Sequence, residues 1–372
     1  MKVSTRPRSY RVKRIPETIR AGTRSGHPPN ATGLAATLEV VWRTRKKVVS
    51  ILINESTSNI LLAPADLRRL RNVASVRFET LKSLTESDAR RLIAGADAVV
   101  TGWGTPQMTA SILDHAPRLR LIAHAAGSVK SLISDDVWAR GIRVTTAAPA
   151  IATSVAEFTL GMMIAGLSRA FPLSSLTREG QWPGGGRGKG LCGITIGIIG
   201  AGFVGRRVIS LLRQFPVTIL LHDPCLTARE ASRLGTRKTT LERLAKASDV
   251  ISLHAPSLPS TRHMMDVQIF RLMKPNVIFV NTSRGALVAE AALAARLRRN
   301  RDMQAFLDVT DPEPPARNNP LRKLANVVLT PHIAGFGANF RQGELAVTEI
   351  ERFVKGQRPL YPVTREALAR MA

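Results

Sequence analysis

Short hydrophobic runs alternate with amphipathic segments from Lys46 to Ala147. The runs are rich in Val, Ile and Leu and predict buried strands, and the segments between them predict helices of about ten residues. Strands joined by such helices favour parallel βαβ units. The predicted strands are 46–54, 75–80, 97–103, 119–126 and 142–147, and the predicted helices are 64–73, 85–96 (with Thr85 as N-cap), 109–116 and 134–141.

A second series of the same kind follows from Gly193 to His332. The two series together predict an α/β protein with two parallel-sheet domains. The strands predicted in the second series are 193–200, 217–223, 249–255, 277–283, 303–309 and 326–332, and its helices are 205–215, 241–247, 265–273 and 290–300.

Two further helices connect the series. Residues 154–170 are too apolar for a solvent-facing helix, so we expect this helix to lie between domains or subunits. A last amphipathic helix is predicted from about Asn339 to Lys355. Residues 178–190 form a glycine-rich loop. There is no run of about 18 apolar residues, and the longest candidate, 158–167, is too short to predict a membrane helix.

The charge of the chain is unusual. The 372 residues carry a net charge of +27, and residues 1–47 hold twelve lysines and arginines against two glutamates. Residues 1–45 lack periodicity and predict a basic, disordered extension. Such charge attracts nucleic acid or anionic surfaces without specificity. Because no nucleic-acid-binding motif is present, we expect a generally basic surface with no specific nucleic-acid partner and no membrane partner.

The chain has two cysteines, Cys192 and Cys225. Two cysteines cannot form a disulfide framework, and neither has the CxxC or CxxH spacing of a zinc site. We therefore expect no metal, and this cysteine usage favours a reducing, cytoplasmic location.

The stretch "ITIGIIGAGFVGRRVISLL" predicts a dinucleotide-binding loop. Gly200, Gly202 and Gly205 have the G-x-G-x-x-G spacing between a hydrophobic strand and an amphipathic helix. The first glycine permits a tight turn, the second lets a pyrophosphate approach, and the third lets the helix pack on the strand. Asp223 ends the next strand, where it can accept hydrogen bonds from an adenosine ribose and repel a 2′-phosphate. This combination favours NAD(H) over NADP(H).

Charged and titratable residues follow three later strands. Arg284 comes after "VIFVNTS", Asp308 and Glu313 lie in "FLDVTDPEPP", and His332 lies in "LTPHIAG". The carboxyl ends of parallel strands form the ligand crevice in α/β folds, so we expect these side chains to converge there.

These motifs resemble those of the D-isomer-specific 2-hydroxyacid dehydrogenases. The resemblance runs from about Lys46 to the C-terminus and is carried by "GIIGAGFVG", "HDP", "SLHAPSLPST", "MKPNVIFVNTSRGALV", "LDVTDPEP" and "LTPHIAG". It implies Rossmann-like and flavodoxin-like domains, with an NAD-binding domain (153–333) inserted into a discontinuous substrate domain (46–152 and 334–372). It also implies a homodimer and a small anionic 2-keto or 2-hydroxy acid as substrate.

The resemblance assigns roles to the strand-end residues. His332 would act as the acid/base at the C2 oxygen, and Glu313 would stabilise its protonated form. Arg284 would hold the carboxylate and carbonyl oxygens of the substrate, because a planar cation can grip both. The backbone of Ala126, Gly127 and Ser128 would hold the substrate carboxylate.

The cofactor-binding residues implied by the motifs and the resemblance form a larger set: Gly200, Gly202, Phe203, Val204, Gly205, Asp223, His254, Thr282, Asp308, His332 and Gly335. Asp308 would help to orient the site near the nicotinamide. Gly335 and Gly337 would let the chain turn back after His332. The sequence departs from the family at Ala289, where an acid is usual, and at Lys130, where many relatives have aspartate. Lys130 leaves the substrate open.

Several functions stay open from sequence alone. The leading hypothesis is an NAD-dependent 2-hydroxyacid dehydrogenase, or 2-ketoacid reductase. The alternative is a catalytically weak, NAD(H)-sensing interaction protein of the same fold, similar to corepressors that retain the same residues. Formate dehydrogenases share the superfamily but usually have Gln at the position of Glu313, so that residue disfavours them.

Overall fold

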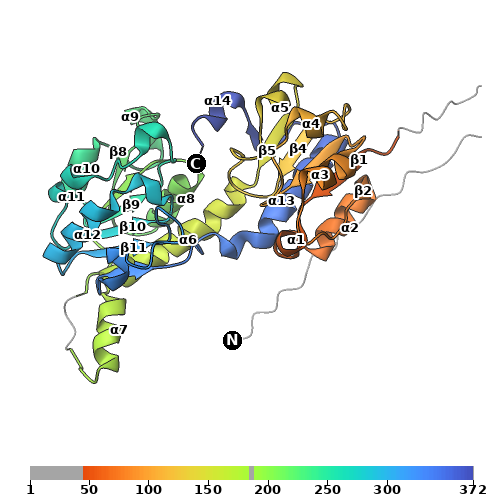
Figure 1. The fold of residues 1–372 in the computed structure, drawn as a ribbon. Coiled ribbons are helices and arrows are strands. Elements are labelled where there is room, and N and C mark those ends of the chain that lie inside the picture. The colour runs from red at the N-terminus through yellow and green to blue at the C-terminus, as the bar shows by residue number, and fades with distance from the viewer. Residues whose placement is uncertain (1–44, 184–187, 372) are drawn as a thin grey trace, which may run out of the picture. The chain divides into compact units, whose positions relative to one another are not determined.

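The computed structural model describes residues 45–183 and 188–371. The predicted disordered extension lies outside these residues except for Arg45, and so does the centre of the predicted glycine-rich loop. Strands and helices alternate along the described chain and form two sheets with helices around them (Figure 1).

The first sheet has six strands in the order β13–β5–β4–β3–β1–β2. Strands β1 to β5 are parallel and follow the order 2-1-3-4-5 of flavodoxin-like folds. Strand β13, which was not predicted, pairs antiparallel with β5. The bounds are β1 (Val48–Leu52), β2 (Ser75–Arg77), β3 (Ala98–Thr101), β4 (Leu121–His124), β5 (Arg143–Thr146) and β13 (Pro362–Val363).

The four helices predicted around this sheet are present, as is the cap at Thr85. The Thr85 side chain accepts a hydrogen bond from the N–H of Asp88, whose carboxylate accepts one from the N–H of Thr85. Helices α1 and α14 were missed because they are short and have no apolar periodicity. The bounds are α1 (Glu55–Leu61), α2 (Pro64–Val73), α3 (Glu86–Ile93), α4 (Ala110–Leu113), α5 (Asp135–Ala139) and α14 (Arg365–Leu368).

The second sheet has seven parallel strands in the order β12–β11–β10–β9–β6–β7–β8. Its order reverses between β6 and β9, as in the Rossmann fold, so the predicted fold class is confirmed. Strand β8, only two residues long, was not predicted. The bounds are β6 (Thr195–Ile199), β7 (Thr218–His222), β8 (Arg237–Lys238), β9 (Val250–Leu253), β10 (Ile278–Asn281), β11 (Gln304–Leu307) and β12 (Val327–Leu329).

The helices that follow these strands include the four predicted ones. Helices α7 and α9 were missed, and residues 171–177 of α7 had been left unassigned between the predicted helix 154–170 and the predicted loop 178–190. The bounds are α7 (Ala170–Arg178), α8 (Phe203–Leu212), α9 (Ala228–Arg233), α10 (Leu241–Ala247), α11 (Val267–Leu272) and α12 (Glu290–Arg299). Four 3₁₀ turns are η1 (Pro259–Thr261), η2 (Gly285–Leu287), η3 (Pro320–Lys323) and η4 (Phe336–Ala338).

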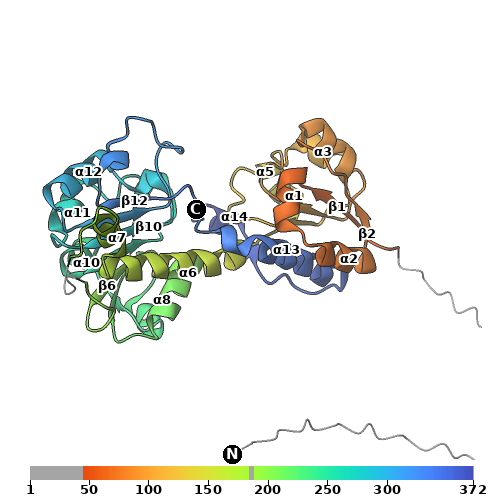
Figure 2. The same ribbon diagram turned by 90° about the horizontal axis from the view of Figure 1, so that it is seen from below.

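Two longer helices, α6 (Ala148–Leu167) and α13 (Asn339–Val354), contact each other, and α6 also packs on α8 and β10 (Figure 2). Helix α13 has the predicted bounds. Helix α6 begins six residues earlier than predicted, because alanines and Pro149 in its first turn favour helix initiation. The predicted domain boundaries stay a prediction, since contacts group Arg45–Ala372 as one unit.

Helix α6 also corrects the expectation that the longest apolar segment, 158–167, is too short to cross a membrane. In the described residues it is the one helix that is long and apolar enough to cross a membrane by length and composition. Buried core helices pass the same test, and Met163 of α6 is fully buried in the apolar core shared with the second sheet.

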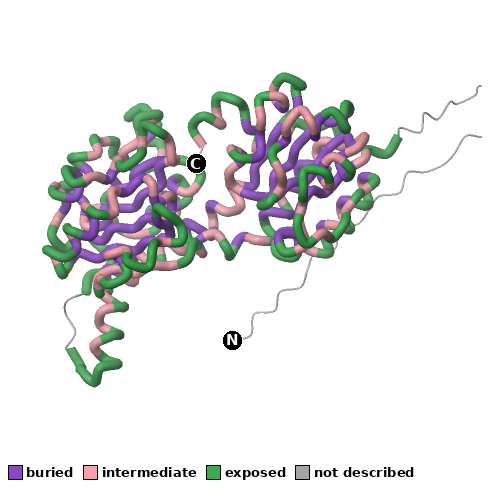
Figure 3. Tube along the Cα trace, in the orientation of Figure 1, coloured by how far each residue is buried: buried purple, intermediate pink, exposed green. Residues whose placement is uncertain are grey.

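Each sheet has an apolar core on both faces. In β3, Val99 packs into one core and Val100 into the other, and in β10 Phe279 and Val280 do the same. This alternation follows from the two-residue period of a strand. The central strands are consequently buried on both sides (Figure 3), which leaves their carboxyl ends as the place where polar side chains can be exposed.

Candidate active site

The cofactor loop, Gly200–Gly205, joins β6 to the N-terminus of α8. Gly200 has a φ of 90°, and a Cβ there would lie 2.8 Å from the backbone of His254 and Ala255. A Cβ on Gly205 would lie 2.0 Å from the carbonyl oxygen of Gly200. Gly202, in contrast, faces open space. Two glycines are therefore needed for packing, and the third leaves the helix N-terminus accessible to a pyrophosphate.

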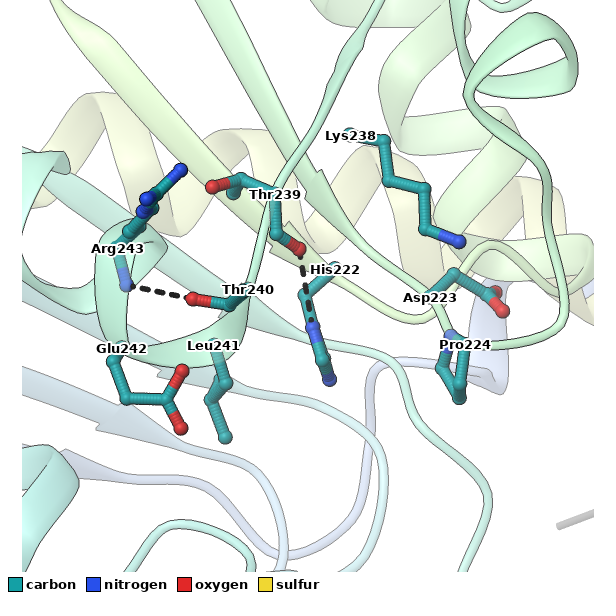
Figure 4. A pocket seen from close by; sticks show the side chains of 9 residues that line it. All are labelled: His222, Asp223, Pro224, Lys238, Thr239, Thr240, Leu241, Glu242 and Arg243. Atoms are coloured by element: carbon teal, nitrogen blue, oxygen red, sulfur yellow. Dashed lines mark hydrogen bonds between the residues drawn. The ribbon is translucent and has the colours of Figure 1, made fainter.

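Asp223 lies beside this loop, directly after β7. Its carboxylate accepts hydrogen bonds from the N–H groups of Ala201 and Cys225, each at 2.8 Å. Each carboxylate oxygen has a second lone pair, which leaves acceptor capacity for a ribose. The adjoining pocket is lined by His222, Asp223, Pro224, Lys238, Thr239, Thr240, Leu241, Glu242 and Arg243 (Figure 4). The loop, the helix end and Asp223 thus fit a dinucleotide such as NAD.

Arg284 follows β10 and is partly buried. Its Nη1 donates to the carbonyl oxygen of Ser283 at 2.7 Å, and Asn281 donates to the Arg284 carbonyl at 3.0 Å. Burial lowers the pKa of the guanidinium, and the negative charge of Glu313 opposes that shift. Within the described residues, no carboxylate lies within ion-pair distance of Arg284. The guanidinium is therefore free to bind an anion.

His332 and Glu313 form a hydrogen-bonded pair. The Nδ1 atom of His332 lies 2.8 Å from Oε1 of Glu313, and the two side chains are 50% and 39% exposed. Nε2 has no hydrogen bond to a described residue, so it is the ring nitrogen that can reach a substrate. The backbone of His332 has a φ of 54°. The turn after β12 is therefore made at His332 itself.

This geometry corrects the prediction for the glycines after His332. Gly335 has a φ of −88°, so it makes no left-handed turn. A Cβ on Gly335 would lie 3.3 Å from the Ile151 side chain, and one on Gly337 would lie 3.2 Å from the Ser154 hydroxyl. These glycines allow the chain to pass close to α6. A contact between Gly335 and the cofactor stays a prediction.

Asp308 is almost fully buried and orients the loop that carries His332. Its carboxylate accepts hydrogen bonds from the Thr330 hydroxyl at 2.5 Å and from the N–H groups of Ile333 and Ala334 at 2.9 Å. The N–H of His332 donates to the Asp308 carbonyl at 2.9 Å. Asp308 thus fixes the loop that carries His332, and its predicted role near the nicotinamide stays a prediction. A contact with the cofactor stays a prediction.

The strands explain how the catalytic candidates meet. Strands β10, β11 and β12 are neighbours, and Asn281, Leu307 and Leu329 are paired at their carboxyl ends. Arg284, Glu313 and His332 all follow these three ends. A Cβ on Gly285 would lie 2.0 Å from the backbone of Thr310, so the loops after β10 and β11 are in close contact.

The remaining predicted cofactor residues lie around the cofactor loop and α6. His254 is buried, its Nε2 lies 2.9 Å from the Ser252 hydroxyl, and burial lowers its pKa to about 3. The Thr282 hydroxyl lies 3.0 Å from that of Thr159 on α6. In the first turn of α8, Phe203 is exposed and Val204 is partly buried. Direct contacts of these side chains with a cofactor stay predictions.

The substrate loop, Ala126–Ser128, follows β4. Thr146 donates from its hydroxyl to the carbonyl oxygens of Ala126, at 3.2 Å, and Gly127, at 2.6 Å. Among the described residues, no acceptor takes the N–H groups of the three loop residues. N–H groups without a described acceptor are a feature of anion-binding loops, but the binding of a substrate carboxylate by this loop stays a prediction.

Two residues beside this loop, Thr146 and His124, are not among the predicted site residues. Thr146 was missed because a threonine at a strand end gives no distinctive signal. His124 ends β4, directly before the loop, and is buried with Nδ1 3.0 Å from the Thr101 hydroxyl. Burial lowers the pKa of His124 to about 4, while the backbone of Ser128 opposes that shift, so His124 is neutral near pH 7 and lies close to the loop.

The described residues contain no group of three or more His, Cys, Asp or Glu side chains that could hold a metal ion. At the start of α12, Ala289 makes no side-chain cap, as its identity predicts.

Comparison with known sequences gives a family and close relatives. The family model described as "D-isomer specific 2-hydroxyacid dehydrogenase, NAD binding domain" matches residues 160–334. The chain is 33% identical over 283 residues to a glyoxylate reductase of Aeropyrum pernix, covering 73% of this chain and 84% of that protein. It is 32% identical over 296 residues to a D-3-phosphoglycerate dehydrogenase of Methanocaldococcus jannaschii, covering 78% of this chain. The aligned region is 56% of that longer relative.

Solved structures share the fold. A D-lactate dehydrogenase of Aquifex aeolicus, complexed with NAD and lactic acid, superposes with a TM-score of 0.65 at 26% identity. The superposition covers 83% of this chain and 96% of that chain.

Proposed function

Because the chain belongs to the D-isomer-specific 2-hydroxyacid dehydrogenase family, whose members are NAD-dependent oxidoreductases, we propose that it interconverts a 2-keto acid and a 2-hydroxy acid. The observation that carries the proposal is the His332–Glu313 pair, 2.8 Å apart, beside the partly buried and unpaired Arg284. A proton carrier and an anion-binding cation are the two groups that this reaction requires from the protein.

The proposed mechanism assigns one task to each group. When bound, NAD(H) supplies or accepts the hydride at C2. His332 gives a proton from Nε2 to the C2 oxygen during reduction and removes it during oxidation. Glu313 accepts the Nδ1 hydrogen bond and stabilises the imidazolium. Arg284 binds the substrate carboxylate and polarises the carbonyl, while the N–H groups of the substrate loop hold the carboxylate in place.

The proposal names NAD(H) as the preferred cofactor. The glycines of the cofactor loop and the N-terminus of α8 would hold the pyrophosphate, and Asp223 would accept hydrogen bonds from the ribose. A 2′-phosphate would meet the negative charge of Asp223. Kinetics with NADH and NADPH tests this point, and a strong preference for NADPH would contradict it.

The test of activity uses the full chain with NADH and a panel of 2-keto acids that includes glyoxylate, hydroxypyruvate and phenylpyruvate. We expect NADH oxidation with at least one acid and a loss of about 100-fold or more in His332→Ala, because acid catalysis contributes about that much. His115→Ala, which removes an exposed histidine elsewhere, is the matched control. The comparisons do not favour the NAD-sensing alternative. No turnover with intact NADH binding would support it instead.

We also propose a cytoplasmic homodimer. Helix α7 buries none of its residues (Figure 3). It carries the exposed Phe171, and Ile164 of α6 and Trp182 are exposed nearby in sequence. Helix α7 contacts α6, and the ring centroid of Phe171 lies 5.8 Å from that of Phe306, but the exposed apolar side chains of this surface have no other cover among the described residues. A second copy of the chain is the occupant that we infer for this surface. Light scattering should give a dimer, and Phe171→Asp should give monomers. A monomeric wild type would contradict the proposal.

A further inference from the structure

The side chain of Lys130 places a second positive charge at the substrate loop. Lys130 lies two residues after Ser128 and is partly buried. Its Nζ donates to the carbonyl oxygen of Ser257 at 3.3 Å. Ser257 lies in the loop after β9, and β9 is the neighbour of β10 in the second sheet. The ammonium group is therefore held between the substrate loop and the loops that form the cofactor side of the site.

Hydrogen bonds connect the Ser257 loop to Arg284. The Ser283 hydroxyl donates to the Ala255 carbonyl at 2.6 Å, and Arg284 donates to the Ser283 carbonyl. The loops that carry Lys130 and Arg284 thus both contact the loop after β9. Lys130 and Arg284 are also close enough to interact by charge, since burial and the positive charge of Arg284 both lower the pKa of Lys130.

Neither cation has a paired carboxylate. Among the described residues, the ion pairs include no acid within 4.0 Å of Lys130 or Arg284. Glu313 affects the charge of Arg284, but its hydrogen bond is to His332. Two partly buried like charges repel each other, and the repulsion is relieved when an anion binds to both.

The proposed reaction supplies one negative charge to this site. A simple 2-keto acid has one carboxylate, which Arg284 and the substrate-loop N–H groups can bind. The charge of Lys130 is then still unmatched. We propose that Lys130 is a specificity-determining residue that binds a second anionic group, a carboxylate or a phosphate, at the far end of the 2-keto acid. This inference rests on the proposed function and narrows its substrate class to 2-keto acids with two anionic groups (dianions).

The test compares substrates that differ in the distal charge. One pair is 2-oxoglutarate and 2-oxopentanoate, in which a methyl group replaces the distal carboxylate. Another pair is 3-phosphohydroxypyruvate and hydroxypyruvate, in which a hydroxyl group replaces the distal phosphate. Comparing the two pairs shows whether a carboxylate or a phosphate is the preferred distal group. We expect wild-type kcat/KM to be higher for at least one dianion than for its monoanionic partner.

The matched variants are Lys130→Met, which keeps the length of the side chain and removes its charge, and Lys130→Arg, which keeps the charge. Lys130→Met should lower kcat/KM for the preferred dianion by about 10- to 100-fold, the usual effect of a charge-assisted hydrogen bond, and mainly through KM. In Lys130→Met, kcat/KM for the monoanionic partner of that substrate should change by less than about 3-fold. Lys130→Arg should keep most of the wild-type kcat/KM for the dianion.

Three results would overturn the inference. Equal losses for dianions and monoanions would mean that Lys130 only connects the two loops through Ser257. A larger dissociation constant for NADH in Lys130→Met would mean that Lys130 binds the cofactor. Wild-type preference for monoanions would show that no distal anion is bound.

A binding measurement separates this inference from the proposed function. The fluorescence of protein-bound NADH is titrated with 2-oxoglutarate and 3-phosphohydroxypyruvate in the wild type and in Lys130→Met. Lys130-dependent binding without turnover of any acid would overturn the proposed function and support the inference. Turnover of monoanions without Lys130-dependent binding of either dianion would support the proposed function and overturn the inference.

Discussion

The cofactor loop and the substrate loop both follow a parallel strand, but different interactions hold them in place. The cofactor loop is fixed by backbone packing, since Gly200 and Gly205 have no room for a Cβ. The substrate loop is held by the Thr146 hydroxyl, with the buried His124 next to it. Changes in the cofactor loop should therefore disturb packing and cofactor binding together, whereas changes under the substrate loop should alter substrate binding and leave cofactor binding unchanged.

The largest expected effect is that of Gly205→Ala. The new Cβ would lie 2.0 Å from the carbonyl oxygen of Gly200. Overpacking of this kind typically costs about 1–3 kcal/mol, and we expect the upper end because the opposing atom is backbone. Denaturant unfolding and NADH titration should both show a loss. Gly190→Ala, where a Cβ meets nothing within 4 Å, is the control. Unchanged stability and NADH affinity in Gly205→Ala would show that backbone packing does not fix the cofactor loop.

The next effect concerns pH and the buried His124. Its pKa is about 4 in the folded protein and about 6.5 in the unfolded chain, so the unfolded state binds more protons between these values. Stability should fall as the pH decreases from 6.5 to 4, by on the order of 2–3 kcal/mol from this group. His124→Asn should reduce that pH dependence when unfolding is measured across this window. An identical dependence in the variant would show that His124 is not held neutral.

His254 provides the matching case under the cofactor loop. Its pKa in the folded protein is about 3, lower than that of His124. The loss of folding stability caused by His254 should therefore continue as the pH decreases below 4, where the loss caused by His124 levels off.

A smaller effect is expected for Thr146→Val, which keeps the shape of the side chain and removes its hydroxyl. Loss of its hydrogen bonds to Ala126 and Gly127 should loosen the substrate loop and raise KM for 2-keto acids about 10-fold, the effect of about 1.4 kcal/mol. The dissociation constant of NADH should stay the same. Thr177→Val, which removes a hydroxyl on α7, is the control. A matching loss of NADH affinity in Thr146→Val would show that the two loops are not independent.

The same contrast explains what could be predicted from the sequence. The strands and longer helices follow from local periodicity, and the cofactor loop follows from glycine spacing that only a tight backbone turn requires. Arg284, Glu313 and His332 could be placed together because adjacent parallel strands end at one edge of a sheet.

Features that depend on contacts between distant segments could not be predicted. The role of Thr146 requires β4 and β5 to be neighbours, and that of Asp308 requires the loop after β12 to fold back onto β11. The left-handed backbone of His332 also depends on this loop, because isolated sequence would assign such a turn to a glycine. Short elements such as α1 have too few residues for a periodic signal.

The central claim is that His332 and Glu313 act as one catalytic unit, and a double-mutant cycle tests it most directly. The measurement is kcat/KM with NADH and the best 2-keto acid for the wild type, Glu313→Gln, His332→Ala and the double variant. We predict that Glu313→Gln loses about 10- to 100-fold and that the double variant is no slower than His332→Ala, because Glu313 acts only through the imidazole. Losses that multiply in the double variant would contradict the claim.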